Sequence, residues 1–204
     1  MRTTIVCGML GSGKTTFIRQ FARNIKEKTV ILDEKGIKRV LERIAHEILD
    51  RNKGADNLVL VGMQTRGVVL ARRIAEHIRK IESTEMDVGV LDVTMYRDDY
   101  RKPLRQPAVQ VTDIPFSIEG KDVILVDDVL YTGRTARAAL DALIDFGRAK
   151  TIQFAVLIDR GHREFPIHAD YVGKAAITST NEEVLVRVKD IDQKEGVWLV
   201  EVNG

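Results

Sequence analysis

The sequence predicts an α/β protein with a mostly parallel central sheet flanked by helices. Short apolar segments alternate with longer segments whose apolar residues recur at helical spacing, which is the pattern of successive βα units. Residues 58–61 are apolar without interruption, as expected for a strand covered on both faces. With 204 residues, of which 44% are apolar, the chain is large and apolar enough to bury one domain core.

The composition argues against a membrane-spanning, secreted or disulfide-bonded protein. No apolar run approaches the roughly 20 residues that a membrane span needs, and the first residues lack the pattern of a secretory signal. The single cysteine, Cys7, permits neither an internal disulfide nor a multi-cysteine metal site. The net charge of +2 divides into +4 for residues 1–27 and −2 for the rest, so a nucleic-acid site would need basic residues gathered on one face. We therefore expect a cytoplasmic protein with no membrane partner.

The sequence pattern in the first half of the chain predicts three strand–helix units and a fourth strand. Aspartate is a favoured helix N-cap residue, and the apolar residues after Asp33 recur at i, i+3, i+4 and i+7, so a helix is expected to begin after Asp33. This stripe consists of Ile37, Val40, Leu41, Ile44 and Ile48. The predicted strands are 3–7, 29–32, 58–61 and 88–95, and the predicted helices are 15–25, 34–53 and 68–81.

In the second half, residues 97–107 are polar, contain two prolines and predict a long loop. A helix is expected over 134–146, closed by Gly147. Alternation of Val184, Val186 and Val188, and of Val197 and Leu199, indicates two short edge strands at the C terminus. The other predicted strands are 109–114, 123–126 and 152–158.

One candidate phosphate site lies near the N terminus. Residues 8–15 (GMLGSGKT) match the phosphate-loop motif GxxxxGK[ST] completely, between a predicted strand and a predicted helix. In that motif backbone amides surround the phosphates, the lysine reaches the terminal phosphates and the hydroxyl holds Mg²⁺. The residues concerned are Gly8, Gly13, Lys14 and Thr15.

A second candidate occupies residues 123–135 (VILVDDVLYTGRT). A buried strand ends in Asp127 and Asp128, and a Thr/Gly loop then leads into a helix N-terminus that suits one phosphate. Paired carboxylates repel a bare phosphate, but they suit a ligand that also offers hydroxyls or brings Mg²⁺. A sugar phosphate satisfies both halves of this site.

The same stretch resembles the phosphoribosyl-pyrophosphate (PRPP) signature of type I phosphoribosyltransferases. Four further segments extend the resemblance: residues 31–54, VGMQTRG at 61–67, YRDD at 96–99 and DRGHREFPIHADYVGK at 159–174. From about residue 28 to the C terminus the chain is similar to the family of pyrimidine-operon attenuation regulators that are also uracil phosphoribosyltransferases. The resemblance implies a type I phosphoribosyltransferase fold and the reaction of uracil with PRPP to give UMP and diphosphate. It also implies that PRPP carries the Mg²⁺, with no direct protein metal site and no organic cofactor.

The resemblance assigns roles to individual residues. Asp127 and Asp128 would hold the ribose hydroxyls and stabilise the positive charge that develops as pyrophosphate leaves. Thr65 and Arg66 would bind pyrophosphate, although an ordinary strand–helix turn can have the same sequence. The PRPP and 5′-phosphate segment comprises Val123, Ile124, Leu125, Val126, Asp127, Asp128, Val129, Leu130, Tyr131, Thr132, Gly133, Arg134 and Thr135.

Two more segments receive roles from the resemblance. Arg97, Asp98, Asp99 and Arg101 begin a loop that would close over the pyrophosphate and exclude water. Asp159 and Arg160 would lie near the base, with a strand-ending salt bridge as the alternative for Arg160.

The family also regulates pyrimidine genes by binding a stem–loop of leader mRNA, with UMP favouring the bound form, so transcription attenuation is the implied regulatory role. Arg39, Arg43 and His46 fall together on the predicted helix 34–53, opposite its apolar stripe. His162 and Arg163 belong to another family-like segment. These five residues are the candidate RNA contacts, and a solvated charged face is the alternative. The family further suggests a homodimer or homotetramer.

Residues 1–27 depart from the family pattern, so we expect a phosphate-loop-like extension followed by one domain over 28–204. An appended segment without NTPase activity is one interpretation of the extension. The alternative for the whole protein is a nucleotide-binding ATPase, GTPase or kinase that uses Gly8 to Thr15.

Overall fold

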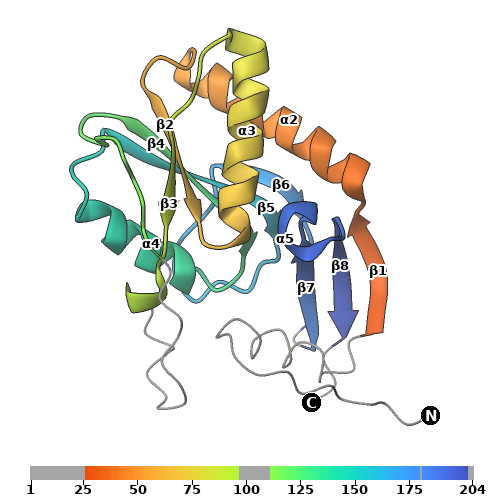
Figure 1. Cartoon of the computed structure of the whole chain (residues 1–204). Helices are drawn as coiled ribbons and strands as arrows, with labels where there is room; N and C mark the ends of the chain where they lie inside the picture. Colours follow the sequence, from red (N-terminus) through yellow and green to blue (C-terminus); the bar gives the residue numbers. More distant parts are fainter. Residues whose placement is uncertain (1–25, 97–110, 180, 202–204) are drawn as a thin grey trace, which may run out of the picture.

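The computed structural model describes residues 26–96, 111–179 and 181–201, which form two sheets with helices around the larger one (Figure 1). The larger sheet has the strand order β3-β2-β4-β5-β6, and all its neighbouring strands are parallel. Its strands are β2 (Leu58–Met63), β3 (Val88–Leu91), β4 (Asp122–Leu130), β5 (Thr151–Asp159) and β6 (Tyr171–Ala175). The predicted α/β class with a mostly parallel central sheet is confirmed.

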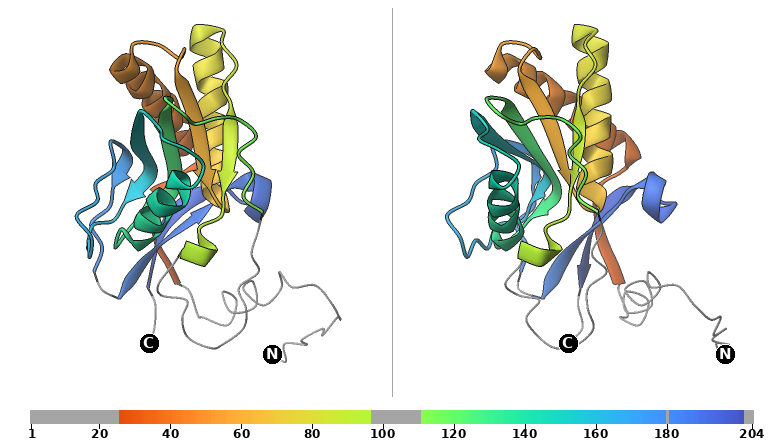
Figure 2. Two further views of the ribbon diagram at one scale, coloured as in Figure 1. Left: turned by 90° about the vertical axis from the view of Figure 1, so that its left-hand side faces the viewer. Right: turned by 60° about the vertical axis from the view of Figure 1, so that its left-hand side comes forward.

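Helices cover both faces of this sheet. In Figure 2, α2 (Glu34–Asn52) and α3 (Arg66–Glu82) lie on one face, and α4 (Arg134–Ile144) lies on the other. Alternate residues of β4 divide between two apolar clusters, with Ile124 packed toward α2 and α3, and Leu125 toward α4. Every residue of β2 is buried, which confirms the prediction of a strand covered on both faces.

The start of α2 follows the predicted capping. The carboxylate of Asp33 accepts a 2.7 Å hydrogen bond from the amide of Gly36, which satisfies one of the unpaired amides of the first turn. The predicted apolar stripe faces the core: Ile37, Leu41, Ile44 and Ile48 are buried, and Val40 packs against them as a half-buried neighbour. Burial of this stripe against α3 and the sheet fixes the orientation of α2.

A smaller antiparallel sheet has the order β1-β8-β7, with β1 at Lys26–Leu32, β7 at Glu182–Arg187 and β8 at Gly196–Glu201. A short helix, α5 (Lys189–Asp192), connects β7 to β8. Both predicted C-terminal strands exist. Of these two, β7 is an edge strand as predicted, whereas β8 is the central strand between β1 and β7. Alternation marks a strand without naming its neighbours, so the pairing of β8 with β1 was not visible in the sequence.

Three predicted elements differ from the structure. The strand predicted over 88–95 ends at Leu91, because the side chain of Asp92 accepts hydrogen bonds from the amide and hydroxyl of Thr94 and turns the chain into the 3₁₀ helix Thr94–Tyr96. Within the described part of the predicted strand 109–114, only Asp113 pairs, in an isolated bridge to Val90. The helix predicted to reach residue 146 ends at Ile144. Strand β6 was not predicted as an element.

The predicted strand 3–7, helix 15–25 and loop 97–107 lie outside the described residues. Strand β1 begins at Lys26, slightly before the predicted domain boundary at residue 28. Among the described helices, none combines the length and apolarity needed to cross a membrane.

Candidate functional site

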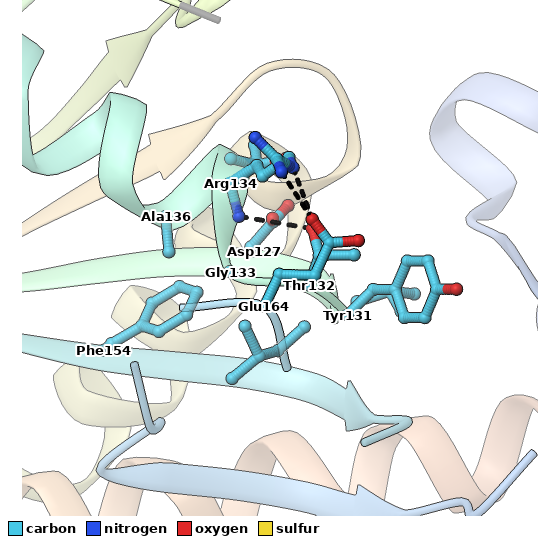
Figure 3. Close-up of a pocket in the computed structure, with 11 residues that line it drawn as sticks. Asp127, Tyr131, Thr132, Gly133, Arg134, Ala136, Phe154 and Glu164 are labelled. Atoms are coloured by element: carbon cyan, nitrogen blue, oxygen red, sulfur yellow. Dashed lines mark hydrogen bonds and ion pairs between the residues drawn. The ribbon is translucent and has the colours of Figure 1, made fainter. Parts of the chain in front are cut away.

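The candidate site is a pocket of about 410 Å³ at the carboxyl end of β4, where the strand leads into α4 (Figure 3). Open α/β sheets bind ligands at this edge, because loops follow the strands there. Most of the residues predicted to bind PRPP line the pocket. Its lining consists of Asp127, Val129, Leu130, Tyr131, Thr132, Gly133, Arg134, Thr135, Ala136, Phe154 and Glu164.

The other residues of the predicted PRPP segment lie outside the pocket lining. Val123, Ile124, Leu125 and Val126 are the buried part of β4 and support the strand that carries the carboxylates. Asp128 follows Asp127 directly on the strand and is half-buried, but it is not part of the pocket lining.

The loop between β4 and α4 presents the N-terminus of a helix to the pocket. Gly133, the N-cap residue, has a φ of 89°, a backbone conformation that favours glycine. The first turn of α4 contains no acidic residue, and the amide of Arg134 donates a 3.4 Å hydrogen bond to the hydroxyl of Thr132. Helix N-termini attract anions through their amides and dipole, so this loop suits a phosphate.

Backbone amides hold both carboxylates of the motif. The amide of Asp128 donates to Asp127 at 2.8 Å, and the amide of Val129 donates to Asp128 at 2.9 Å. Asp127 lines the pocket, whereas Asp128 lies close enough to Arg66 for its charge to raise the pKa of that arginine. The motif therefore places one carboxylate in the pocket and one beside the loop after β2.

The loop predicted to bind pyrophosphate packs directly against the carboxylate strand. A Cβ atom at Gly67 would lie 2.4 Å from the carbonyl oxygen of Val126 and 3.2 Å from the Cα of Asp127. The peptide bond between Gln64 and Thr65 is cis, and Thr65 is exposed as the N-cap residue of α3. The structure thus places Gly67 directly beside Val126 and Asp127, at the start of the segment 127–135.

Arg66 is held by a residue that the sequence analysis did not select. Asp192 of α5 accepts hydrogen bonds from both Nε and Nη2 of Arg66, at 3.0 and 2.7 Å, in a two-bond pair. Burial lowers the pKa of Arg66, but the hydrogen bonds to Asp192 and the charges of Asp192 and Asp128 raise it more. No local sequence signal indicates this pair, because its members lie 126 positions apart.

Arg160 is buried, at 7% exposure, beside the pocket rather than in a strand-ending salt bridge. Its guanidinium carbon lies 3.8 Å from the ring centroid of Tyr131, and its nitrogens donate to the hydroxyl of Thr178 and the carbonyl of Glu182. The strand-ending salt bridge belongs instead to Asp159 and Arg163. Arg160 therefore joins the pocket residue Tyr131 to the smaller sheet.

Asp159 is stabilised as a carboxylate. Burial raises its pKa, but hydrogen bonds from Arg163 and from the amide of Gly161 lower it more, so the pKa lies below the ordinary value. Arg163 also donates to the backbone carbonyls of Ile167, Tyr131, Leu130 and Gly161. This candidate RNA residue is thus engaged within the chain, where it ties the segment after β5 to the pocket loop.

Glu164 is a second residue of the site that the sequence analysis did not select. Its carboxylate accepts from Nε of Arg134 at 2.7 Å and lies 2.6 Å from Nη2, as the dashed lines in Figure 3 show. Phe165 lies beneath the same guanidinium, with 5.1 Å between the guanidinium carbon and the ring centroid. Residues 164 and 165 come from the loop after β5, so only the fold shows that they border the phosphate loop.

The other candidate RNA residues lie in two places. Arg39, Arg43 and His46 are exposed on α2, as predicted. Arg43 is anchored there, because it donates to the carbonyls of Val172 and Gly173 at 3.0 and 2.6 Å and pairs with Glu47. His162 is exposed, but its Nε2 lies 2.6 Å from the carbonyl oxygen of Thr178.

Some predicted site residues cannot be placed. Gly8, Gly13, Lys14 and Thr15 of the phosphate-loop motif, and Arg97, Asp98, Asp99 and Arg101 of the predicted closing loop, lie outside the described residues. Within the described ranges, no group of three or more His, Cys, Asp or Glu side chains is arranged to hold a metal ion.

Comparisons with known proteins show which family the chain resembles. Residues 28–190 match the family model of the phosphoribosyl transferase domain. The "Bifunctional protein PyrR" of Pelotomaculum thermopropionicum is 60% identical over 176 residues, which cover 86% of this chain and 97% of that protein. The protein of the same name from Bacillus mycoides is 57% identical over 175 residues, covering 85% of this chain and 97% of that protein.

Solved structures show the same fold at low sequence identity. A hypoxanthine-guanine phosphoribosyltransferase of Bacillus anthracis matches with a TM-score of 0.66 and 20% identity, over 87% of this chain and 99% of that chain. A hypoxanthine phosphoribosyltransferase of Trypanosoma cruzi matches with a TM-score of 0.65 and 20% identity, over 86% of this chain and 98% of that chain. The chain therefore belongs to the family of the bifunctional PyrR proteins and is a phosphoribosyltransferase.

Proposed function

We propose that this protein transfers the phosphoribosyl group of PRPP to uracil, giving UMP and diphosphate, and that it regulates pyrimidine biosynthetic genes by UMP-dependent binding to leader mRNA. One observation carries the enzymatic part: the N-terminus of α4, Asp127 and the start of α3 converge at one edge of the sheet. That edge offers separate places for the phosphate, the ribose and the pyrophosphate of PRPP.

The three parts of PRPP divide among three groups. The amides and hydroxyls of residues 131–135 bind the 5′-phosphate at the positive end of α4. Asp127 and Asp128 hold the ribose hydroxyls, and their negative charge stabilises the cation that develops at the ribose as pyrophosphate leaves. Thr65 and Arg66 bind the departing pyrophosphate. PRPP brings the Mg²⁺, which its own phosphate oxygens hold.

The base side of the site is proposed around Asp159, Arg160 and Tyr131. Arg160 and Tyr131 stack on each other at the edge of the pocket, and Arg163 holds Asp159. These contacts make a rigid wall, which suits recognition of a small planar base. The proposed closing loop begins with Arg97, Asp98, Asp99 and Arg101. It keeps water away from PRPP, because water would otherwise hydrolyse PRPP.

The exposed face of α2 is the proposed RNA surface. Arg39 and His46 are exposed there beside the anchored Arg43. Contacts from basic side chains to phosphates supply sequence-independent affinity, and unpaired loop bases supply specificity. Binding of a leader stem–loop in the cytoplasm, by a homodimer or homotetramer, then controls transcription termination.

Formation of UMP from labelled uracil and PRPP with Mg²⁺ tests the enzymatic proposal in the full chain. We expect Asp127→Asn and Asp128→Asn to lower kcat by about 10²–10³-fold, as for loss of one electrostatic contact to the transition state. Asp141→Asn is the matched control, since Asp141 lies on the exposed side of α4 in an ion pair with Arg137. Turnover of hypoxanthine in place of uracil would contradict the proposed base, and no product with either base would contradict the proposed reaction.

A gel-shift titration of leader RNA, with and without UMP, tests the regulatory proposal. Tighter binding with UMP is the expected result. Equal binding to an unrelated hairpin of the same length would show that the RNA affinity is only electrostatic.

A further inference from the structure

The connection between β7 and β8 places a carboxylate against the arginine of the β2–α3 loop. Asp192 receives two hydrogen bonds from Arg66, and the side chains are 15% and 25% exposed. Such planar two-bond pairs are the most directional ion pairs that proteins make. The guanidinium of Arg66 therefore has a defined orientation in the ligand-free protein.

Asp192 is itself held in place from two sides. Its Oδ2 also accepts a 3.0 Å hydrogen bond from the amide of Val188, which opens the same segment. Farther along α3, Arg73 binds Asp190 and Glu195, and the carboxylate of Glu195 also accepts from the amide of Lys189. The segment 188–195 is thus docked on α3 by two arginines of that helix, so Asp192 is a rigid partner for Arg66.

The pair leaves part of Arg66 available to a ligand. A guanidinium has five N–H donors, and Asp192 occupies Nε and one donor of Nη2. No described residue accepts a hydrogen bond from Nη1 of Arg66. The edge of the guanidinium opposite Asp192 therefore retains its donors, on an arginine that begins α3 next to the carboxylate strand.

We propose that Asp192 is a positioning residue for pyrophosphate binding: it clamps one edge of Arg66 and so presents the other edge to the pyrophosphate group of PRPP. This inference rests on the pyrophosphate role given to Arg66 in the proposed function. A long arginine side chain loses rotamer freedom when it binds a ligand, and Asp192 removes that freedom before the substrate arrives. The smaller sheet thereby contributes to the site through α5, without touching the reacting atoms.

A double-mutant cycle on the full chain tests the proposal. The proteins are the wild type, Asp192→Asn, Arg66→Ala and the double variant, and the probe is Mg²⁺–PRPP, measured by calorimetry and by uracil turnover. We expect Asp192→Asn to weaken PRPP binding and raise its KM about tenfold, as for loss of an outer partner of a binding residue. The kcat and the KM for uracil stay within about twofold, since the clamp acts on binding of one group.

Comparing Asp192→Asn in the wild type and in the Arg66→Ala variant distinguishes an effect through Arg66 from a general loss of structure. In the Arg66→Ala background, Asp192→Asn has no further effect on PRPP affinity, because the residue through which it acts is gone. Glu76→Gln is the matched control on α3, where it loses only an exposed pair with Lys80, and PRPP affinity stays unchanged. Thermal unfolding of each variant checks that the fold is intact.

Three results would overturn the inference. The first is unchanged PRPP affinity in Asp192→Asn. The second is tighter PRPP binding in that variant, which would make Asp192 a competitor of pyrophosphate for Arg66. The third is a loss of PRPP affinity on Asp192→Asn that is equally large in the presence and absence of Arg66. If the wild type binds PRPP but forms no UMP, the proposed reaction fails while the affinity cycle still decides the role of Asp192. If the wild type binds no PRPP, both proposals fail.

Discussion

Gly67 packs so closely against Val126 that a Cβ atom at residue 67 would lie 2.4 Å from the Val126 carbonyl oxygen. This approach presses the start of α3 onto β4 just before Asp127. The loop that we propose for pyrophosphate and the strand that carries the proposed ribose carboxylates are therefore joined through their backbones, which deform little. The spacing between the two halves of the site depends on the absence of a side chain at residue 67.

Gly67→Ala is expected to lower kcat/KM for PRPP by about a hundredfold, because displacing a reactant by about 1 Å has an effect of that size. Steady-state kinetics with PRPP as the varied substrate measures the loss. Gly89→Ala is the matched control, since the atoms nearest to its added methyl belong to the side chains of Ile114 and Phe116, at 3.1–3.4 Å, and not to the backbone. Equal kinetic losses in the two variants would contradict the special role of the contact.

Gly133→Ala is expected to reduce stability by roughly 1–2 kcal/mol, because alanine is strained at a φ of 89°. It should also raise the KM for PRPP, since the loop at the N-terminus of α4 must change shape. Gly120→Ala separates the two effects: Gly120 also has a positive φ, of 66°, but an added methyl there would meet nothing within 4 Å and would be remote from the pocket lining. Urea unfolding should show similar losses, and only Gly133→Ala should change the KM.

Arg39→Ala is expected to weaken binding of leader RNA and to reduce the slope of log affinity against log salt by about one unit, as for loss of one phosphate contact. Arg43→Ala should also weaken RNA binding, and it should in addition reduce stability by about 1 kcal/mol, because it removes hydrogen bonds to Val172 and Gly173. Filter binding at several salt concentrations and thermal unfolding give the two readouts. Unchanged RNA affinity in both variants would show that α2 is not the RNA surface.

Asp122 should make stability depend on pH. Burial raises its pKa, but hydrogen bonds from Lys150, Thr151 and Asn57 lower it more, so the folded pKa lies below the ordinary value. A carboxyl of this kind stabilises the fold fully above its unfolded pKa of about 3.9, and the stabilisation is lost as the pH falls through the folded pKa.

Asp122→Asn is therefore expected to lower the free energy of unfolding by roughly 1–3 kcal/mol at pH 7, since it weakens hydrogen bonds to a charged group. The difference from the wild type should narrow at pH 3. Urea unfolding at the two pH values measures both differences, and a difference that is the same at pH 3 and pH 7 would rule out the ionised carboxylate as its source.

Helices and strands with a strong local sequence pattern could be predicted. Those whose length or pairing depends on contacts with other parts of the chain could not. Helix α2, with its N-cap residue and its apolar stripe, lies where the spacing of apolar residues predicted a helix. Strand β2 lies where the continuous apolar run predicted a strand. The strand predicted over 88–95 was too long, because the side chain of Asp92 turns the chain after Leu91. The predicted strand 109–114 has one bridge in its described part, from Asp113 to Val90. Beside that bridge the amide of Asp92 donates to the hydroxyl of Thr112 and not to its backbone, so the ladder does not continue.

By itself, the sequence determined the α/β class, the carboxylate–loop–helix segment 127–135 and the family, because each follows from short sequence patterns that can be recognised without knowing which segments meet in space. Only the tertiary structure decided what surrounds that segment: Gly67 against Val126, Glu164 on Arg134, Arg160 on Tyr131 and Asp192 on Arg66. These contacts join residues far apart in sequence, and a charged residue looks the same in the sequence whether it is solvated or paired. Folding settles the difference, because burial makes an unpaired charge so unfavourable that each buried arginine must find its partner.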